Sequence, residues 1–320
     1  MRFNTRVDHF FIKRLFVDLR LSWEQEDLER SEQLLNVISF IKGKCNVQLV
    51  RGQISQLGQE ARENPHLRKF LDPNNLDCPI VPLEHERLPQ GDEKANPILL
   101  EEKAFWDRIF LILKEKPNQK DRGYASQNGV LILDVEKFRS KWSVMIREKS
   151  KTFAQGQAAS LDDILGEILL PSKAFVLIDP YLCSDYQVKR RYQLLVKILE
   201  TISSRVGVAF HFHLITRIED KSMSDSGARE IEAEVRKTVR QRFPAIKFCL
   251  TNIPRNNPIN LHDRHLLSTY LNLEIPAGFD NFRKGKAHTQ TTIRFTHIFA
   301  NSETYTRNRE WVCKAVEGGK

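Results

Sequence analysis

The chain has 320 residues, of which 41% are hydrophobic and 28% charged, a composition typical of a globular protein with a sizeable core. It contains no run of about 18 apolar residues, and its first residues, MRFNTRVDHFFIKR, lack the pattern of a cleavable signal. These features exclude a membrane-spanning class and favour a cytoplasmic location. The length exceeds that of one ordinary domain, so we expect two.

Charge and cysteine content narrow the classes of partner and cofactor. The formal net charge of +9 favours a polyanionic partner such as nucleic acid or an anionic lipid surface, although the same charge also serves solubility alone. The five cysteines are scattered and form no CxxC pair, which argues against a disulfide framework and a zinc finger. Glycine-rich dinucleotide fingerprints, Walker lysine loops and GxSxG elbows do not occur. The sequence therefore predicts no cofactor, and its cysteines indicate no metal site.

The first half combines strand-like and helix-like segments with long polar stretches. Residues 15–23 alternate apolar and polar side chains, which predicts a half-buried strand. Residues 72–96 are rich in Pro, Asn, Asp and Gly and predict a long irregular connection. We also expect helices at 24–42, 53–71, 97–115 and 135–148, strands at 46–50 and 130–133, and a polar loop at 116–128.

A boundary between two domains is expected in the polar stretch that follows. Residues 149–160, KSKTFAQGQAAS, are the best linker candidate by composition. We therefore divide the chain into an N-terminal α/β or α+β domain, 1–152, and a second domain, 153–320.

The second half follows a simpler pattern in which short apolar strands alternate with helices. Such alternation predicts right-handed βαβ units and a mixed or largely parallel sheet with helices on both faces, an α/β fold. In chain order we expect a helix at 161–170, a strand at 174–178, a helix at 186–203, a strand at 209–216, a helix at 226–243, and strands at 245–251, 266–274 and 291–300, the last two separated by a turn at 276–278.

Ligands of such sheets bind outside the carboxyl ends of the strands. Asp179 and Tyr181 follow the first of these strands, Arg217 follows the second, and a polar segment after the third leads to the cluster HDRH at residues 262–265. We therefore expect the functional site where this cluster meets Asp179.

Three interpretations of the cluster stay open. In the first, His262 is a nucleophile or general base and Arg264, on the same strand face, holds a phosphate, while His265 points the other way. In the second, His262, Asp263, Asp179 and His265 bind a divalent metal, although no matching upstream histidine pattern supports it. In the third, Asp263 and Arg264 form ion pairs that hold a strand end. The histidines at 211 and 213 fit a packed strand better than a metal site.

Five segments of the second half resemble a known family: VLIDPYL, YQLLVKILE, HLIT, LHDRHLLST and AGFDNF, in this order. They are similar to the phospholipase-D-like domain that follows the MIT module of a eukaryotic membrane-trafficking protein, and to stand-alone bacterial relatives of that domain. The likeness covers residues 161–299. It implies a phospholipase-D-like α/β fold whose active members carry His-x-Lys, followed four residues later by Asp, in two copies joined by duplication or dimerisation.

The match to that motif is partial. His262 matches the family histidine, Arg264 stands in place of the lysine, Thr269 stands in place of the acidic residue, and a second copy is not evident. The resemblance therefore implies either a metal-independent phosphodiesterase completed by a second protomer, or a non-catalytic module that binds acidic phospholipid, as the trafficking relative does.

Together these observations predict a bacterial, cytoplasmic, phospholipase-D-like protein that binds a phosphate polymer, most simply nucleic acid, and forms a homodimer if it is a nuclease. The alternative is a non-catalytic module for acidic membranes or a protein partner. The expected catalytic residues are His262, Arg264, Asp263 and Asp179, and the expected substrate-binding residues are Tyr181, Arg217 and His265.

Overall fold

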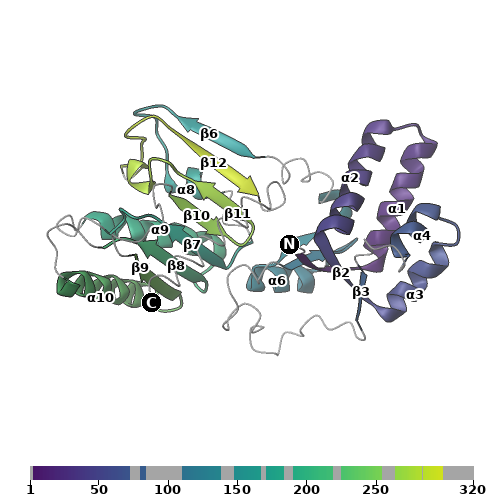
Figure 1. The fold of residues 1–320 in the computed structure, drawn as a ribbon, viewed down its shortest axis with the longest axis horizontal. Coiled ribbons are helices and arrows are strands. Elements are labelled where there is room, and N and C mark those ends of the chain that lie inside the picture. Colours follow the sequence, from purple (N-terminus) through teal and green to yellow (C-terminus); the bar gives the residue numbers. More distant parts are fainter. Residues whose placement is uncertain are drawn as a thin grey trace. The chain divides into compact units, whose positions relative to one another are not determined.

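The chain forms two compact units, Met1–Met145 and Ile146–Lys320, in a computed structural model (Figure 1). Each unit contains one β-sheet with helices packed on it, so the predicted α/β class is confirmed. Among the described residues, no helix combines the length and the apolar composition that crossing a membrane requires. The structure describes residues 3–72, 80–83, 110–137, 148–166, 171–183, 190–218, 225–253, 264–282 and 284–297.

The first unit is built on a five-stranded parallel sheet with the order β3-β2-β1-β4-β5. The central strand is β1; β2 and β3 follow on one side of it, and β4 and β5 are then added on the other side. Right-handed crossovers then place α6 on the opposite sheet face from α1 and α2 (Figure 1). The strands are β1 (Phe3–Val7), β2 (Cys45–Val50), β3 (Ile80–Leu83), β4 (Phe110–Leu113) and β5 (Leu131–Leu133), and the helices are α1 (His9–Glu24), α2 (Leu28–Lys44), α3 (Arg51–Glu60), α4 (Pro65–Leu71) and α6 (Gln119–Asn128).

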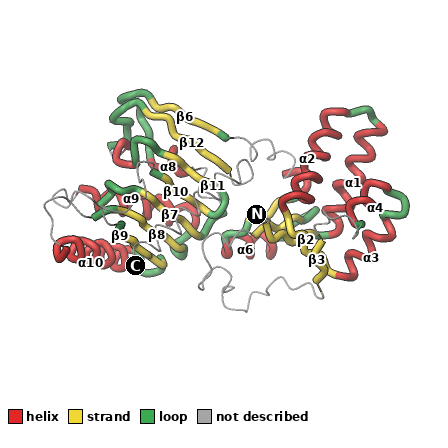
Figure 2. Tube along the Cα trace, viewed as in Figure 1, coloured by secondary structure: helices red, strands yellow, loops and turns green. Residues whose placement is uncertain are grey.

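The strand predicted at 15–23 is wrong, because these residues lie inside helix α1 (Figure 2). The helix begins where the Asp8 carboxylate accepts a hydrogen bond from the Phe10 backbone N–H at 3.0 Å. Leu21 and Trp23, which complete the alternating pattern, are 37% and 43% exposed. The buried side chains instead recur at helical spacing, which the alternation concealed. They are Phe11, Ile12, Leu15, Phe16, Asp18, Leu19 and Ser22.

The polar loop predicted at 116–128 is also wrong, since α6 occupies most of it. Asn118 and Asp121 form a capping box, in which each side chain accepts a hydrogen bond from the other's backbone N–H at 2.9 Å. Asp121 is buried and pairs with Lys114 at 2.8 Å. A helix with so small an apolar face has no hydrophobic periodicity to read, and its caps alone reveal it.

Other expectations in the first unit need smaller corrections. The helix predicted at 53–71 is two helices, α3 and α4, because Asn64 and Pro65 begin a new helix: the Asn64 side chain accepts hydrogen bonds from two following backbone N–H groups. The connection at 72–96 contains β3, and the end of the helix predicted at 97–115 is strand β4. Most of the remainder of both segments, and most of the helix expected at 135–148, lie outside the described residues.

The second unit is built on a seven-stranded sheet with the order β6-β12-β11-β10-β7-β8-β9. Strands β7, β8 and β9 are parallel, as the βαβ pattern predicts, whereas the other neighbours pair antiparallel. The strands are β6 (Lys149–Phe153), β7 (Ala174–Ile178), β8 (His211–Thr216), β9 (Lys247–Asn252), β10 (His265–Ser268), β11 (Leu271–Glu274) and β12 (Thr291–His297), and the helices are α8 (Leu161–Leu165), α9 (Arg190–Val206) and α10 (Asp225–Arg242).

Two expectations for this unit are corrected by its sheet. The linker predicted at 149–160 begins with strand β6, which pairs with β12 and therefore belongs to the sheet. The single strand predicted at 266–274 is the hairpin β10–β11, where Ser268 Oγ accepts a hydrogen bond from the Leu271 backbone N–H at 3.1 Å. Its apolar residues read as one run because both strands are buried.

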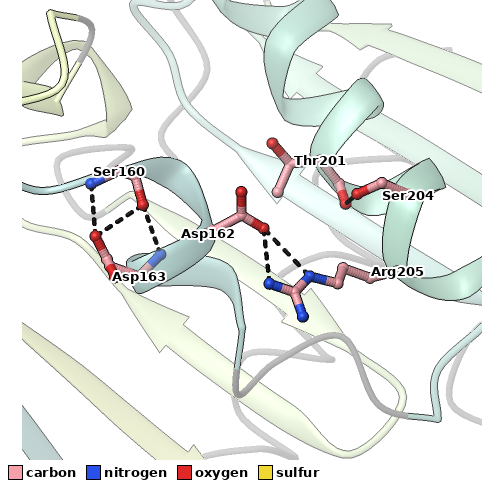
Figure 3. Close-up of polar contacts among 6 residues, drawn as sticks. All are labelled: Ser160, Asp162, Asp163, Thr201, Ser204 and Arg205. Atoms are coloured by element: carbon pink, nitrogen blue, oxygen red, sulfur yellow. Dashed lines mark hydrogen bonds and ion pairs between the residues drawn. The ribbon is translucent and has the colours of Figure 1, made fainter.

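One face of this sheet packs against α8, α9 and α10. Alternate strand residues such as Leu177 and Leu214 share a hydrophobic core with Leu199 of α9 and Val235 of α10. Helix α8 begins at Ser160, whose backbone N–H and hydroxyl donate hydrogen bonds to Asp163 and lower the pKa of that carboxyl (Figure 3). Helix α8 is also joined to α9 on the surface, where two guanidinium N–H groups of Arg205 donate to one oxygen of Asp162 at 3.1 and 3.2 Å (Figure 3). This core holds β7, β8 and β10 in place, and the candidate site lies at the ends of these three strands.

Candidate functional site

The candidate site lies where the carboxyl ends of β7 and β8 meet the beginning of β10. Ile178 of β7 is paired with His265 of β10 and with Ile215 of β8. One step beyond these pairs, Arg264 and Thr216 stand on either side of Asp179. Neighbouring residues on adjacent strands point to the same sheet face, so these three side chains form a row on the face that carries the core.

Asp179 organises the turn that follows β7. Its side chain is buried, and Oδ1 accepts a hydrogen bond from the Tyr181 backbone N–H at 3.0 Å. Its own backbone N–H donates to the Ile215 carbonyl at 3.0 Å, and the Arg217 backbone N–H donates to the Pro180 carbonyl at 3.3 Å. The Asp-Pro-Tyr turn is therefore fixed to the neighbouring strand end by both of its first residues.

Arg264 lies between an aromatic ring and a tight turn. Its guanidinium carbon lies 4.9 Å from the centroid of the Tyr181 ring, and Nη1 donates to the Pro276 carbonyl. Gly278, with a φ of +71°, lets this turn approach: a Cβ there would lie 3.3 Å from Arg264 Nε and 3.5 Å from Asp179 Oδ2. The positive φ favours glycine, and a side chain at this position would push against the Arg264 side chain.

Two buried polar atoms at this edge have no hydrogen-bond partner among the described residues. They are Oγ1 of Thr216, a fully buried residue, and Nε of Arg217. Buried polar atoms are nearly always hydrogen-bonded, so each of these two requires a partner that the described part of the chain does not supply.

The remaining predicted site residues are placed differently. His262 and Asp263 lie outside the described residues. His265 lies on the opposite sheet face from Arg264, where Nδ1 is 3.2 Å from Asn272 Oδ1. Thr269, where the resemblance predicts an acidic residue, is buried at the β10–β11 turn. The structure therefore brings together Asp179, Tyr181 and Arg264, with Arg217 alongside.

Sequence reasoning missed the contribution of the turn after β11. Residues 276–278 were predicted as a turn, but nothing in the sequence indicated that its carbonyl and its glycine would contact the Arg264 side chain. The antiparallel pairing of β10 with β7 produces this contact, and that pairing has no local signal.

Of the two histidines of strand β8, His213 contacts the neighbouring strand β9. His213 Nε2 lies 2.8 Å from Thr251 Oγ1, and burial together with the charge of Arg236 lowers the pKa of this histidine to about 4. Burial lowers the pKa of His297 to about 3. Across the described residues, no group of three or more His, Cys, Asp or Glu side chains could hold a metal ion.

Comparison with known proteins finds similarity only at the level of structure. No protein-family model and no curated protein sequence matches the chain. Among solved structures, NucT from Helicobacter pylori is 12% identical with a TM-score of 0.31, over 54% of this chain and 98% of that one. Phosphatidylserine synthase from Haemophilus influenzae Rd KW20 is 10% identical with a TM-score of 0.33, over 64% of this chain and 47% of that one.

Proposed function

We propose that the second unit binds a phosphate polymer, most simply nucleic acid, at the edge formed by Asp179, Tyr181 and Arg264, and that it is a metal-independent phosphodiesterase. The observation that carries this proposal is the state of Arg264. Its guanidinium is positioned by Tyr181 and the Pro276 carbonyl, yet no carboxylate of the described residues forms an ion pair with it. A positioned arginine whose charge no described carboxylate neutralises suits a phosphate, which its planar fork of donors matches.

This observation favours the first of the three interpretations of the HDRH cluster. The structural interpretation needs Arg264 to be neutralised in an ion pair, and within the described residues it is not. The +9 net charge of the chain also favours a polyanion over a neutral ligand.

The proposed chemistry follows from the residue types. The imidazole of His262 attacks phosphorus, the bond from phosphorus to the leaving oxygen breaks, and that oxygen takes a proton from water or from the same histidine of the second protomer. Water then hydrolyses the phosphohistidine. Arg264 neutralises the charge that develops on the phosphoryl oxygens, and Asp179 or Asp263 orients the histidine. A second protomer supplies the second copy of the motif that this chain lacks.

The experiment is cleavage of single- and double-stranded DNA and RNA in EDTA by the full chain. Loss of activity in His262→Ala, with activity retained in His265→Ala, is the expected result, because His265 faces the other side of the sheet. Activity that requires added magnesium, or that survives in His262→Ala, would contradict the proposed chemistry.

A second candidate function is binding without cleavage, to an acidic phospholipid surface or to a protein partner. The observation that favours it is Thr269, which is 2% exposed where active members of the family carry a carboxylate. Binding confined to vesicles that contain phosphatidylserine, without cleavage of any nucleic acid, would establish the membrane form of this function. Failure to bind either vesicles or nucleic acid would leave a protein partner.

A further inference from the structure

An exposed aromatic ring stands at the candidate site. Tyr181 is 41% exposed even though Arg264 lies over its ring at 4.9 Å. The ring is not on a loose segment, since the Tyr181 backbone N–H is held by the Asp179 carboxylate at 3.0 Å. A tyrosine therefore presents aromatic surface to solvent from a fixed backbone position.

One arginine lies against this tyrosine, and a second follows the neighbouring strand. Arg264 precedes β10 and contacts the ring, while Arg217 follows β8 and is joined through its backbone to Pro180. The Arg217 Nε atom has no hydrogen-bond partner in the described part of the chain. Positive groups beside an exposed ring are the combination with which proteins bind unpaired nucleic-acid strands: the cations contact phosphates and the ring stacks on a base.

We infer that Tyr181 is a base-stacking residue and that the site takes nucleic acid with at least one unpaired base. The base lies against the tyrosine ring, and Arg264 and Arg217 bind the phosphates on its two sides. This inference rests on the proposed function and extends it, because phosphate binding alone would not distinguish a single strand from a duplex or a lipid headgroup. In a duplex the base faces are covered by their neighbours, so the ring has nothing to stack on.

The test measures equilibrium binding by fluorescence anisotropy, using the full chain with His262→Ala so that the strand stays intact. The probes are a labelled single-stranded DNA, an abasic strand of equal length, and the corresponding duplex. Tyr181→Ala is compared with Tyr181→Phe, which keeps the ring. We expect Tyr181→Ala to weaken single-strand binding by roughly 5- to 100-fold and Tyr181→Phe to bind like the parent.

The abasic strand shows whether Tyr181→Ala weakens binding through lost base stacking or through displacement of Arg264. It carries the same phosphates without bases, so we expect the parent and Tyr181→Ala to bind it equally. An equal loss on the abasic and ordinary strands would show that the ring only supports Arg264, and would overturn the inference. Unchanged single-strand binding in Tyr181→Ala would overturn it while leaving the proposed function in place. A parent that binds neither strand nor duplex would overturn both.

Discussion

Two glycines of the second unit allow the contact at Arg264 to be tested separately from backbone strain. Gly278 and Gly285 have φ values of +71° and +73°. A Cβ at residue 278 would meet Arg264 Nε at 3.3 Å and Asp179 Oδ2 at 3.5 Å, whereas a Cβ at residue 285 would meet no atom within 4 Å. Gly278→Ala and Gly285→Ala therefore both place an L residue at a positive φ, but only Gly278→Ala adds a close contact with Arg264.

Both variants should lose stability by about 1–2 kcal/mol, the cost of placing an L side chain at a left-handed φ. Only Gly278→Ala should move the guanidinium, because a contact of 3.3 Å requires the neighbour to shift by a few tenths of an ångström. A charge-assisted hydrogen bond contributes roughly 1.5–3 kcal/mol. We expect partial loss of one such bond to phosphate, on the order of 1 kcal/mol or about fivefold in Kd.

The assays are urea denaturation for stability and anisotropy with labelled single-stranded DNA for affinity, each on the full-length variants. The expected pattern is similar stability losses in both variants and weaker DNA binding in Gly278→Ala alone. If both variants bind DNA like the wild type, or both bind it equally weakly, then the contact between residue 278 and Arg264 does not position a phosphate-binding group.

Three further outcomes are expected. Arg264→Gln should reduce the slope of log K against log salt concentration by about 1, measured by DNA titrations at several salt concentrations, and an unchanged slope would place the phosphate elsewhere. Because burial lowers the folded-state pKa of His213 to about 4 from an ordinary value of about 6.5, its contribution to stability is present above pH 6.5 and is lost as the pH falls toward 4. Between pH 7 and 5 this loss should be about 2 kcal/mol, and denaturation curves of His213→Gln should show a pH dependence smaller by that amount. Asp121→Ala should cost about 1–3 kcal/mol of stability, since it removes the hydrogen bond that the Asp121 carboxylate accepts from the Asn118 backbone N–H and the ion pair with Lys114, and a thermal melt that matches the wild type would contradict this.

The local sequence pattern was sufficient to predict an element whose own residues show one clear pattern of apolar side chains. The run AFVLI at Ala174–Ile178 is buried at every position, and continuous apolar runs of this length between helices identify parallel strands. Local pattern failed where two periods fit the same residues, as in α1, and where a helix has almost no apolar face, as in α6. In both cases the deciding contacts come from other elements, which a single segment does not contain.

The sequence by itself determined that polar residues follow the strands of the second half, and that Arg264 directly follows His262 and Asp263. It could not determine which of these side chains meet. The antiparallel pairing of β10 with β7 sets Arg264 beside Asp179 and His265 on the other face, because strand side chains alternate and a shift of one residue would exchange the two. The turn at Gly278 then brings the Pro276 carbonyl to the guanidinium. Pairings between distant segments are decided by burial of the whole sheet, and only the tertiary structure contains that information.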